Sequence, residues 1–199
     1  MGPANKFVAE IFGRVRCAVS IIALLSASTG VCSAQGPDAE YQIKAAFLFH
    51  FAQLVDWPGD VAGSASQSIN LCVLEDEPQR QEIQTMVDGK PLGSRVFHVR
   101  VLHQAQESQG CQLFFLSRDM ARKQSAILKS LHGMPVLTVG ETDSFLSDGG
   151  MICFHLDADR IRFDVDLGAA ESSHLRISSR LLLLASNVLR GNTQTAEAR

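Results

Sequence analysis

Acidic side chains at the end of a buried strand are the first feature of this sequence that could do chemistry. Residues 69–74 (INLCVL) form an apolar run, and Glu75 and Asp76 follow it directly. Carboxylates in this position can hold a divalent cation beside a phosphorylated aspartate. However, Ser117 stands where that aspartate would follow the next buried strand, and no Lys follows residues 151–156. The sequence therefore lacks the rest of a phosphotransfer site.

The histidines and possible nucleophiles form no catalytic set. The sequence has no GxSxG elbow, no glycine-rich phosphate loop and no HExxH motif. A triad assembled from residues far apart in the sequence stays open, but we predict a protein that is not an enzyme and that has no cofactor or metal. None of the histidines has the spacing of metal ligands on a helix: His50, His98, His103, His132, His155 and His174.

The charge balance argues against a nucleic-acid partner. The chain has 18 basic and 21 acidic residues in 199, a formal net charge of −3. Binding to a phosphate backbone needs a basic patch that displaces counterions. This length and an apolar fraction of 46% fit one globular domain.

The N-terminal residues are typical of a secretory signal peptide. A basic start precedes the apolar run 17–28, and Cys32-Ser33-Ala34 is a small-x-small cleavage site. We predict cleavage after Ala34 and export to the periplasm. A membrane anchor needs about 20 apolar residues, so this run fits one poorly. Lipid attachment at Cys32 also fits poorly, because residues 29–31 lack the required Leu.

Export gives the remaining cysteines a role. Cys72, Cys111 and Cys153 stay in the mature chain. In an oxidising compartment three cysteines suggest one disulfide and one free thiol. We favour a Cys72 to Cys111 pair, because both lie near buried strands of one sheet, and three buried free thiols are the alternative.

Apolar periodicity predicts a single three-layer α/β domain over residues 35–191, with a mixed, mostly parallel sheet, helices on both faces and a C-terminal hairpin. We predict a disordered tail over 192–199. The predicted helices are 40–56, 78–87, 118–131, a short one at 141–146, and 178–189 capped by Gly191; the predicted strands are 69–74, 95–102, 112–116, 136–139, 151–156 and 160–167.

The last predicted strand alternates strictly between apolar and charged residues. Its charged face, with Arg162, Asp164 and Asp166, predicts an edge strand protected from indiscriminate pairing. In the first helix, Phe47, Phe49 and Phe51 cannot all face one core, because alternate helical residues lie about 200° apart. We expect one or two of them to reach the surface, unless the domain covers that helix on two sides.

Residues 41–58 (YQIKAAFLFHFAQLVDWP) carry a KAA motif, an aromatic run and a final acidic-Trp-Pro triplet. This segment resembles the opening signature of the YfiR-like family of periplasmic regulators. Further matching segments cover nearly all of the mature chain: 69–73, 111–117, 149–152, 161–165 and 178–182.

The resemblance implies a repressor that binds the periplasmic domain of an inner-membrane diguanylate cyclase (YfiN-like), lowering cyclic-di-GMP and biofilm formation. It also implies sequestration by an outer-membrane OmpA-like lipoprotein (YfiB-like). The family disulfide falls on Cys72 and Cys111. A second family bridge to the position of Cys153 has no partner here, because Phe145, Leu146 and their neighbours are not cysteines.

Two functional classes stay open. For a protein-binding repressor, the edge strand predicts a partner surface made by Ile152, Asp164 and Val188. For a periplasmic small-molecule sensor or an enzyme on this scaffold, Arg176 is the candidate ligand-binding residue, because it stands near the start of a predicted helix. A homodimer is compatible with either class.

Overall fold

The computed structural model describes residues 37–58 and 67–190. The predicted signal peptide 1–34, Gly191 and the predicted tail 192–199 lie outside the described residues. The elements are α2 Pro37–Leu54, β1 Val55–Asp56, β2 Ser68–Leu74, α4 Arg80–Val87, β3 Pro91–Leu92, β4 Arg95–Leu102, η1 Ala105–Glu107, β5 Leu113–Leu116, η2 Arg118–Met120, α5 Ala121–Leu131, β6 Leu137–Gly140, β7 Ile152–Asp157, β8 Arg160–Asp166, α6 Leu167–Ser172, β9 Arg176–Ile177, α7 Ser179–Leu182 and β10 Asn187–Leu189.

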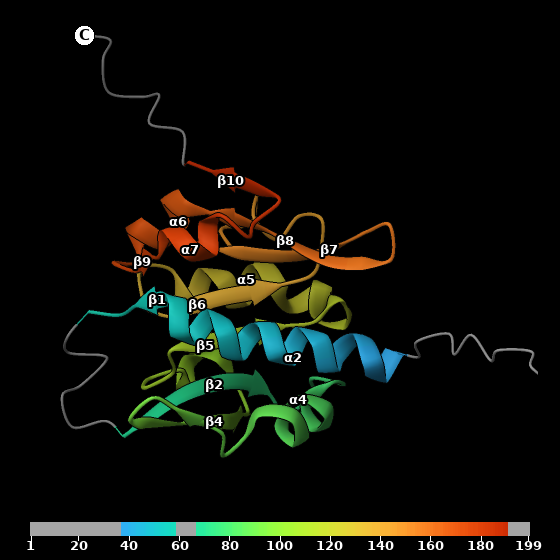
Figure 1. Ribbon diagram of the computed structural model, residues 1–199, viewed down its shortest axis with the longest axis vertical. Helices are drawn as coiled ribbons and strands as arrows, with labels where there is room; N and C mark the ends of the chain where they lie inside the picture. Colours follow the sequence, from blue (N-terminus) through green and yellow to red (C-terminus); the bar gives the residue numbers. More distant parts are fainter. Residues whose placement is uncertain (1–36, 59–66, 191–199) are drawn as a thin grey trace, which may run out of the picture. The chain divides into compact units, whose positions relative to one another are not determined.

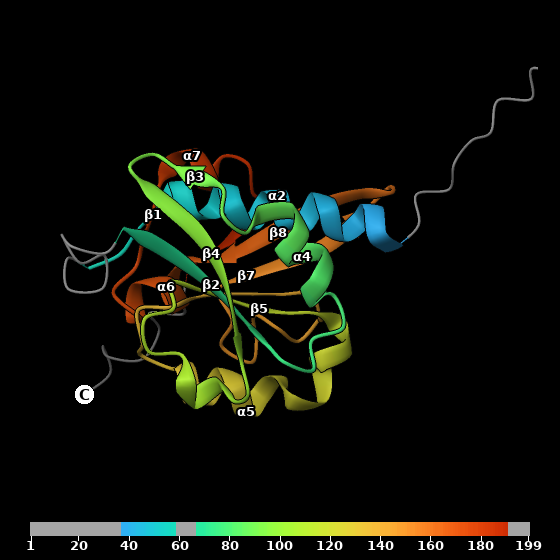
Figure 2. The same cartoon turned by 90° about the horizontal axis from the view of Figure 1, so that it is seen from below.

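The main sheet has the strand order β10-β8-β7-β6-β5-β2-β4-β3 (Figure 1). Most neighbouring strands are parallel, whereas the β7–β8 hairpin and the β3–β4 pair are antiparallel. Helices α2 and α4 lie on one face and α5 on the other (Figure 2). Strands β1 and β9 pair separately as an antiparallel ribbon. The predicted three-layer α/β fold is therefore confirmed.

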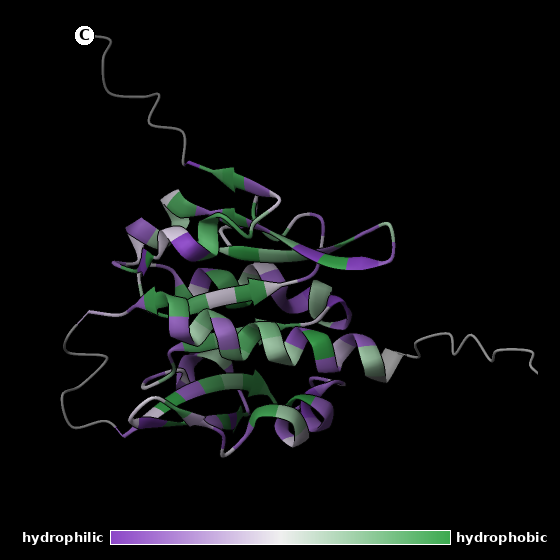
Figure 3. Ribbon diagram, viewed as in Figure 1, coloured by the Kyte–Doolittle hydropathy of each residue, from purple (hydrophilic) through white to green (hydrophobic). Residues whose placement is uncertain are grey.

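Alternation along the central strands divides the core into two layers. In β2, Leu71 and Val73 belong to the core cluster under α2, whereas Cys72 and Leu74 belong to the cluster under α5. Because helices cover both faces, both sets are apolar, and the strand becomes a continuous hydrophobic run. Figure 3 shows apolar residues concentrated in these central strands.

Helix α2 packs aromatic side chains against the sheet on two sides. The ring of Phe47 lies 5.8 Å from the rings of both Phe154 and Phe163, whereas the ring of Phe49 lies 5.4 Å from that of Phe97. The two phenylalanines thus contact opposite ends of the sheet. Phe51 is buried, whereas Phe47 and Phe49 are only half-buried. Two of the three rings therefore reach the surface in part, as expected, while the domain also contacts this helix on two sides.

The C-terminal segment also differs from prediction. In place of one helix over 178–189, a single turn, α7, precedes strand β10, which pairs in parallel with β8. The outer edge of β8 carries backbone groups that another strand can satisfy. The amide of Ser186 donates to the carbonyl of Phe163 (2.8 Å) where the chain joins that edge. The strand predicted over 160–167 is therefore not an edge; the main sheet ends at β10 and β3.

The segment after β6 forms successive turns instead of the predicted short helix over 141–146. Phe145 is fully buried, and its ring lies against the backbone of Gly140 and Gly150. A side chain on either glycine would collide with this ring. Because neither glycine has a side chain, the ring of Phe145 can pack against the backbone there and fix the loop.

Candidate functional site

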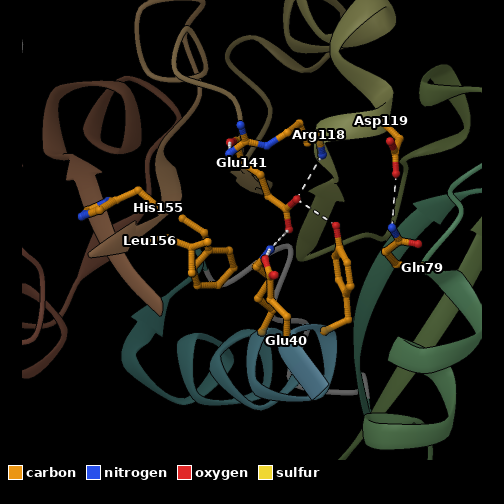
Figure 4. Close-up of a pocket in the computed structure, with 10 residues that line it drawn as sticks. Glu40, Gln79, Arg118, Asp119, Glu141, His155 and Leu156 are labelled. Carbon is orange, nitrogen blue, oxygen red and sulfur yellow. Dashed lines mark hydrogen bonds and ion pairs between the residues drawn. The ribbon is translucent and has the colours of Figure 1, made fainter. Parts of the chain in front are cut away.

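A polar cavity of about 400 Å³ opens at the carboxyl ends of the parallel strands β2, β5 and β6 (Figure 4). Strand β4 lies on one side of β2 and β5 on the other, so the strand order reverses at this point. In open α/β sheets, ligands commonly bind at such a switch point. The lining residues are Glu40, Tyr41, Lys44, Gln79, Arg118, Asp119, Glu141, Phe154, His155 and Leu156.

Glu141 lies at the centre of this cavity, directly after β6 (Figure 4). Its Oε2 accepts hydrogen bonds from the Tyr41 hydroxyl and the Arg118 amide, both at 3.1 Å. Its Oε1 lies 2.8 Å from Nζ of Lys44, and its carbonyl oxygen accepts from the Arg118 guanidinium at 3.1 Å. A buried charge is tolerated only when it is paired and hydrogen-bonded. These contacts meet that requirement.

Lys44 fixes helix α2 to this centre. Its side chain is almost fully buried, and its ammonium group pairs with Glu141 and also with Glu40 one helical turn earlier. The same ammonium lies 4.5 Å from the centre of the Tyr41 ring, a cation–π geometry. Burial and the nearby Glu141 carboxylate raise the pKa of Tyr41 well above its usual value, so its hydroxyl remains a donor. The cavity floor thus holds one ammonium group between two carboxylates and an aromatic face.

A second buried carboxylate, Glu77, lies beside the cavity. Its Oε2 accepts from the amide of Ser117 at 3.0 Å, one residue before the Arg118 amide that binds Glu141. Burial raises the pKa of Glu77, although its hydrogen bonds oppose this effect. Amides at the start of a helix commonly bind phosphate at a switch point. Here the carboxylates of Glu77 and Glu141 occupy these amides.

The rim of the cavity combines acidic and apolar groups. Oδ2 of Asp119 accepts from the Gln79 side chain at 3.2 Å. On the other side, Leu156 is 61% exposed and neighbours His155, whose Nδ1 lies 3.7 Å from Oδ2 of Asp164 (Figure 4). The cavity can therefore offer a ligand both carboxylates and an apolar wall.

The strand-end acids chosen from the sequence lie outside this cavity. Oε2 of Glu75 lies 2.6 Å from Nδ1 of His103, and Asp76 pairs with Lys123. All of these side chains are well exposed. The structure therefore places this pair in surface ion pairs, whereas the neighbouring Glu77 is buried.

The three predicted partner-binding residues occupy the β7, β8 and β10 strands, but only two of them reach the surface. Ile152 is fully buried, because β7 is an interior strand covered on both faces. Asp164 is half-buried, and its Oδ1 accepts from Asn187 on β10 at 2.9 Å. Val188 on β10 is 36% exposed. The expectation that Ile152 adds an exposed apolar side chain is wrong.

Arg176 lies in β9 and not at the start of a long helix. Its backbone pairs with Asp56, and the helix that follows, α7, has only four residues. Its side chain is exposed and lines a shallow cavity with Trp57 and His174. The helix-terminus argument for an anion site at this residue is therefore not supported.

The predicted disulfide is confirmed. Cys72 and Cys111 are bonded, with their Cα atoms 5.9 Å apart, and both lie in the core layer under α5. Cys153 is a buried free cysteine whose thiol donates to the carbonyl oxygen of Thr142 at 3.2 Å. Burial is the main cause that raises the pKa of this thiol to about 11, so it remains a neutral thiol near neutral pH.

Together, the fold and this site define a disulfide-bonded, three-layer α/β domain with a polar cavity at the switch point of its sheet. The sequence pattern of the YfiR/HmsC-like family matches residues 41–186, and the chain belongs to this family. YfiR-like proteins are periplasmic regulators, so membership indicates a regulatory protein. None of the helices in the described ranges is long and apolar enough to cross a membrane.

Two solved structures are similar to this chain at low sequence identity. A conserved domain protein from Vibrio cholerae aligns with a TM-score of 0.47 and 8% identity, covering 74% of this chain and 59% of that protein. The ABC domain from Streptococcus pneumoniae, solved with L-Trp, aligns with a TM-score of 0.45 and 10% identity, covering 61% of this chain and 55% of that one. The chain thus spans less than two thirds of either structure.

Proposed function

We propose that this chain is a periplasmic protein that binds and represses an inner-membrane diguanylate cyclase, lowering cyclic-di-GMP and biofilm formation. Family membership supports a regulator, and the resemblance to YfiR-like repressors supplies the partner, the periplasmic domain of a YfiN-like cyclase. An OmpA-like lipoprotein of the outer membrane, similar to YfiB, would relieve repression by sequestering this chain.

The observation that carries this proposal is the apolar C-terminal edge of the sheet, formed by α7, the following turn and β10. Leu183 is 84% exposed and Leu184 is 61% exposed, and Val188 and Leu189 extend the apolar surface along β10. Clustered exposed apolar groups mark interaction sites more often than scattered ones do. The β10 strand also presents an open backbone edge to which a partner strand can add.

The half-buried Asp164 provides the polar border of this edge through its hydrogen bond to Asn187. Apolar contacts at the centre of an interface supply most of the affinity, whereas charges at the border mainly set the association rate and the choice of partner. We therefore expect the leucines and Val188 to dominate the affinity and Asp164 to contribute to specificity.

Replacing Val188 by Asp tests this surface. The variant should fold normally, because Val188 is a surface residue, but it should repress poorly and so raise cyclic-di-GMP in cells that carry the cognate cyclase. Val101→Asp is a matched control: Val101 is 40% exposed, but it lies on β4 near the opposite edge of the sheet. Full repression by Val188→Asp and Leu184→Asp together, at normal periplasmic abundance, would place the partner surface elsewhere.

A further inference from the structure

We propose that the cavity at the carboxyl ends of β2, β5 and β6 binds a small organic cation, in which an ammonium group is joined to an apolar body. This inference does not depend on the proposed repression of a cyclase, since it rests on the charges and shape of the cavity alone.

The charges of the cavity favour a cation. Its lining has three carboxylates, Glu40, Asp119 and Glu141, and two cationic side chains, Lys44 and Arg118. The amides that would hold an anion at this switch point already bind the buried carboxylates of Glu77 and Glu141. A phosphate or carboxylate ligand would therefore find these amides occupied and would approach a net negative cavity.

The cavity already holds one ammonium group, that of Lys44. This group lies between Glu40 and Glu141 and over the ring of Tyr41, which shows that the site accommodates such a cation. A carboxylate has about four acceptor positions. On the rim, the only hydrogen bond to the exposed Asp119 carboxylate from the described residues comes from Gln79. The Asp119 carboxylate at the rim can therefore accept hydrogen bonds from a second ammonium group.

An apolar wall faces this acidic rim. Leu156 is exposed beside the cavity, and Phe154 contributes to the same wall. A bound ligand with an apolar body would cover Leu156 and displace water from it. The volume of about 400 Å³ is in the range of small-molecule sites. The class of ligand is thus an amine with an aromatic or aliphatic body.

Three probes with the same ring and different charges test the proposal: phenethylamine, 2-phenylethanol and phenylacetate. Calorimetric titration of the mature chain should show binding of phenethylamine with a Kd in the millimolar range or below, weakened by added salt. The neutral and anionic probes should bind more weakly. Failure of phenethylamine to bind, or equal or tighter binding of phenylacetate, would overturn the proposal.

A pair of substitutions then locates the site. Glu40→Gln with Asp119→Asn should weaken phenethylamine binding about tenfold, because two partly exposed ion pairs are lost. Asp157→Asn is the control, since Asp157 is an exposed carboxylate on β7 that does not line the cavity. Asp119→Asn alone serves if the double variant is unstable, and it should weaken binding in the same direction. Unchanged affinity in a folded rim variant would place the amine at another site.

Discussion

The hydroxyl of Tyr41 donates a 3.1 Å hydrogen bond to Oε2 of Glu141, a residue 100 positions later in the chain. One helical turn after Tyr41, Lys44 pairs with the same carboxylate. These contacts hold the first half of α2 against the end of β6, whereas aromatic packing on Phe154 and Phe163 holds its second half. Helix α2 is thus fixed by a polar contact at one end and by an apolar contact at the other.

Replacing Glu141 by Leu should lower the free energy of unfolding by about 3 to 5 kcal/mol, because a buried ammonium group then loses its buried partner. Urea denaturation monitored by circular dichroism measures this change. The exposed Glu171 on α6 provides the control, and Glu171→Leu should change the free energy of unfolding by no more than about 0.5 kcal/mol.

Combining Lys44→Met with Glu141→Leu should destabilise the protein by less than the sum of the two single changes, because neither charge is then left alone. Additive effects of the two substitutions would show that the ion pair does not couple α2 to β6.

The central strands could be predicted from the sequence because burial on both faces produces unbroken apolar runs such as residues 69–74. The disulfide could be predicted for a similar reason, since Cys72 lies inside such a run and Cys111 comes just before another. The C-terminal helix was a wrong prediction because a run of leucines suits a helix by composition. Only the open edge of β8, a tertiary feature, makes residues 187–189 a strand.

The cavity could not be assembled from the sequence, because its residues come from α2, from the segments that follow β2, β5 and β6, and from β7. Two local signals were nevertheless present. Lys44 stands on the apolar face of its helix between Tyr41 and Leu48, and Glu141 directly follows a buried strand. A charge on a buried face requires a partner, but the sequence does not show which residue provides it.

Replacing Cys72 by Ser should lower the free energy of unfolding by about 2 to 5 kcal/mol, because the unfolded chain loses the constraint of the closed loop. Reductant should destabilise the natural chain and Cys153→Ser alike but should have no further effect on Cys72→Ser. Non-reducing peptide mapping provides the direct measurement. A peptide that links Cys153 to either of the other cysteines would contradict the assignment.

Replacing Gly140 by Ala should lower the free energy of unfolding by about 1 to 3 kcal/mol, because the new methyl group collides with the buried ring of Phe145. Relief of this collision would displace the backbone at residue 140 and so move the neighbouring Glu141 away from Tyr41. Thermal denaturation measures the loss, and Asp143→Ala, an exposed change in the same loop, is the control. If Gly140→Ala were as stable as the natural chain, the loop would have repacked around the new methyl group at no cost in free energy.

The pH dependence of stability should report the burial of Glu77. Burial raises the pKa of this carboxyl above its ordinary value of 4.5, so the folded state holds the proton more tightly than the unfolded state does. The contribution of Glu77 to the free energy of unfolding is therefore fully present below pH 4.5. It is lost as the pH rises through the pKa that Glu77 has in the folded state. Glu77→Gln keeps the acceptor for the Ser117 amide but removes the titration.

Urea denaturation at a series of pH values compares the two proteins. The free energy of unfolding of the natural chain, relative to that of Glu77→Gln, should fall as the pH rises from about 4.5 towards neutrality, because only the natural chain must bury a charge at residue 77 in this range. Glu171→Gln, at an exposed position, is the control and should follow the natural curve. If the curves of the natural chain and Glu77→Gln stay parallel, then Glu77 has the same proton affinity in the folded and unfolded states, and its burial does not oppose ionisation.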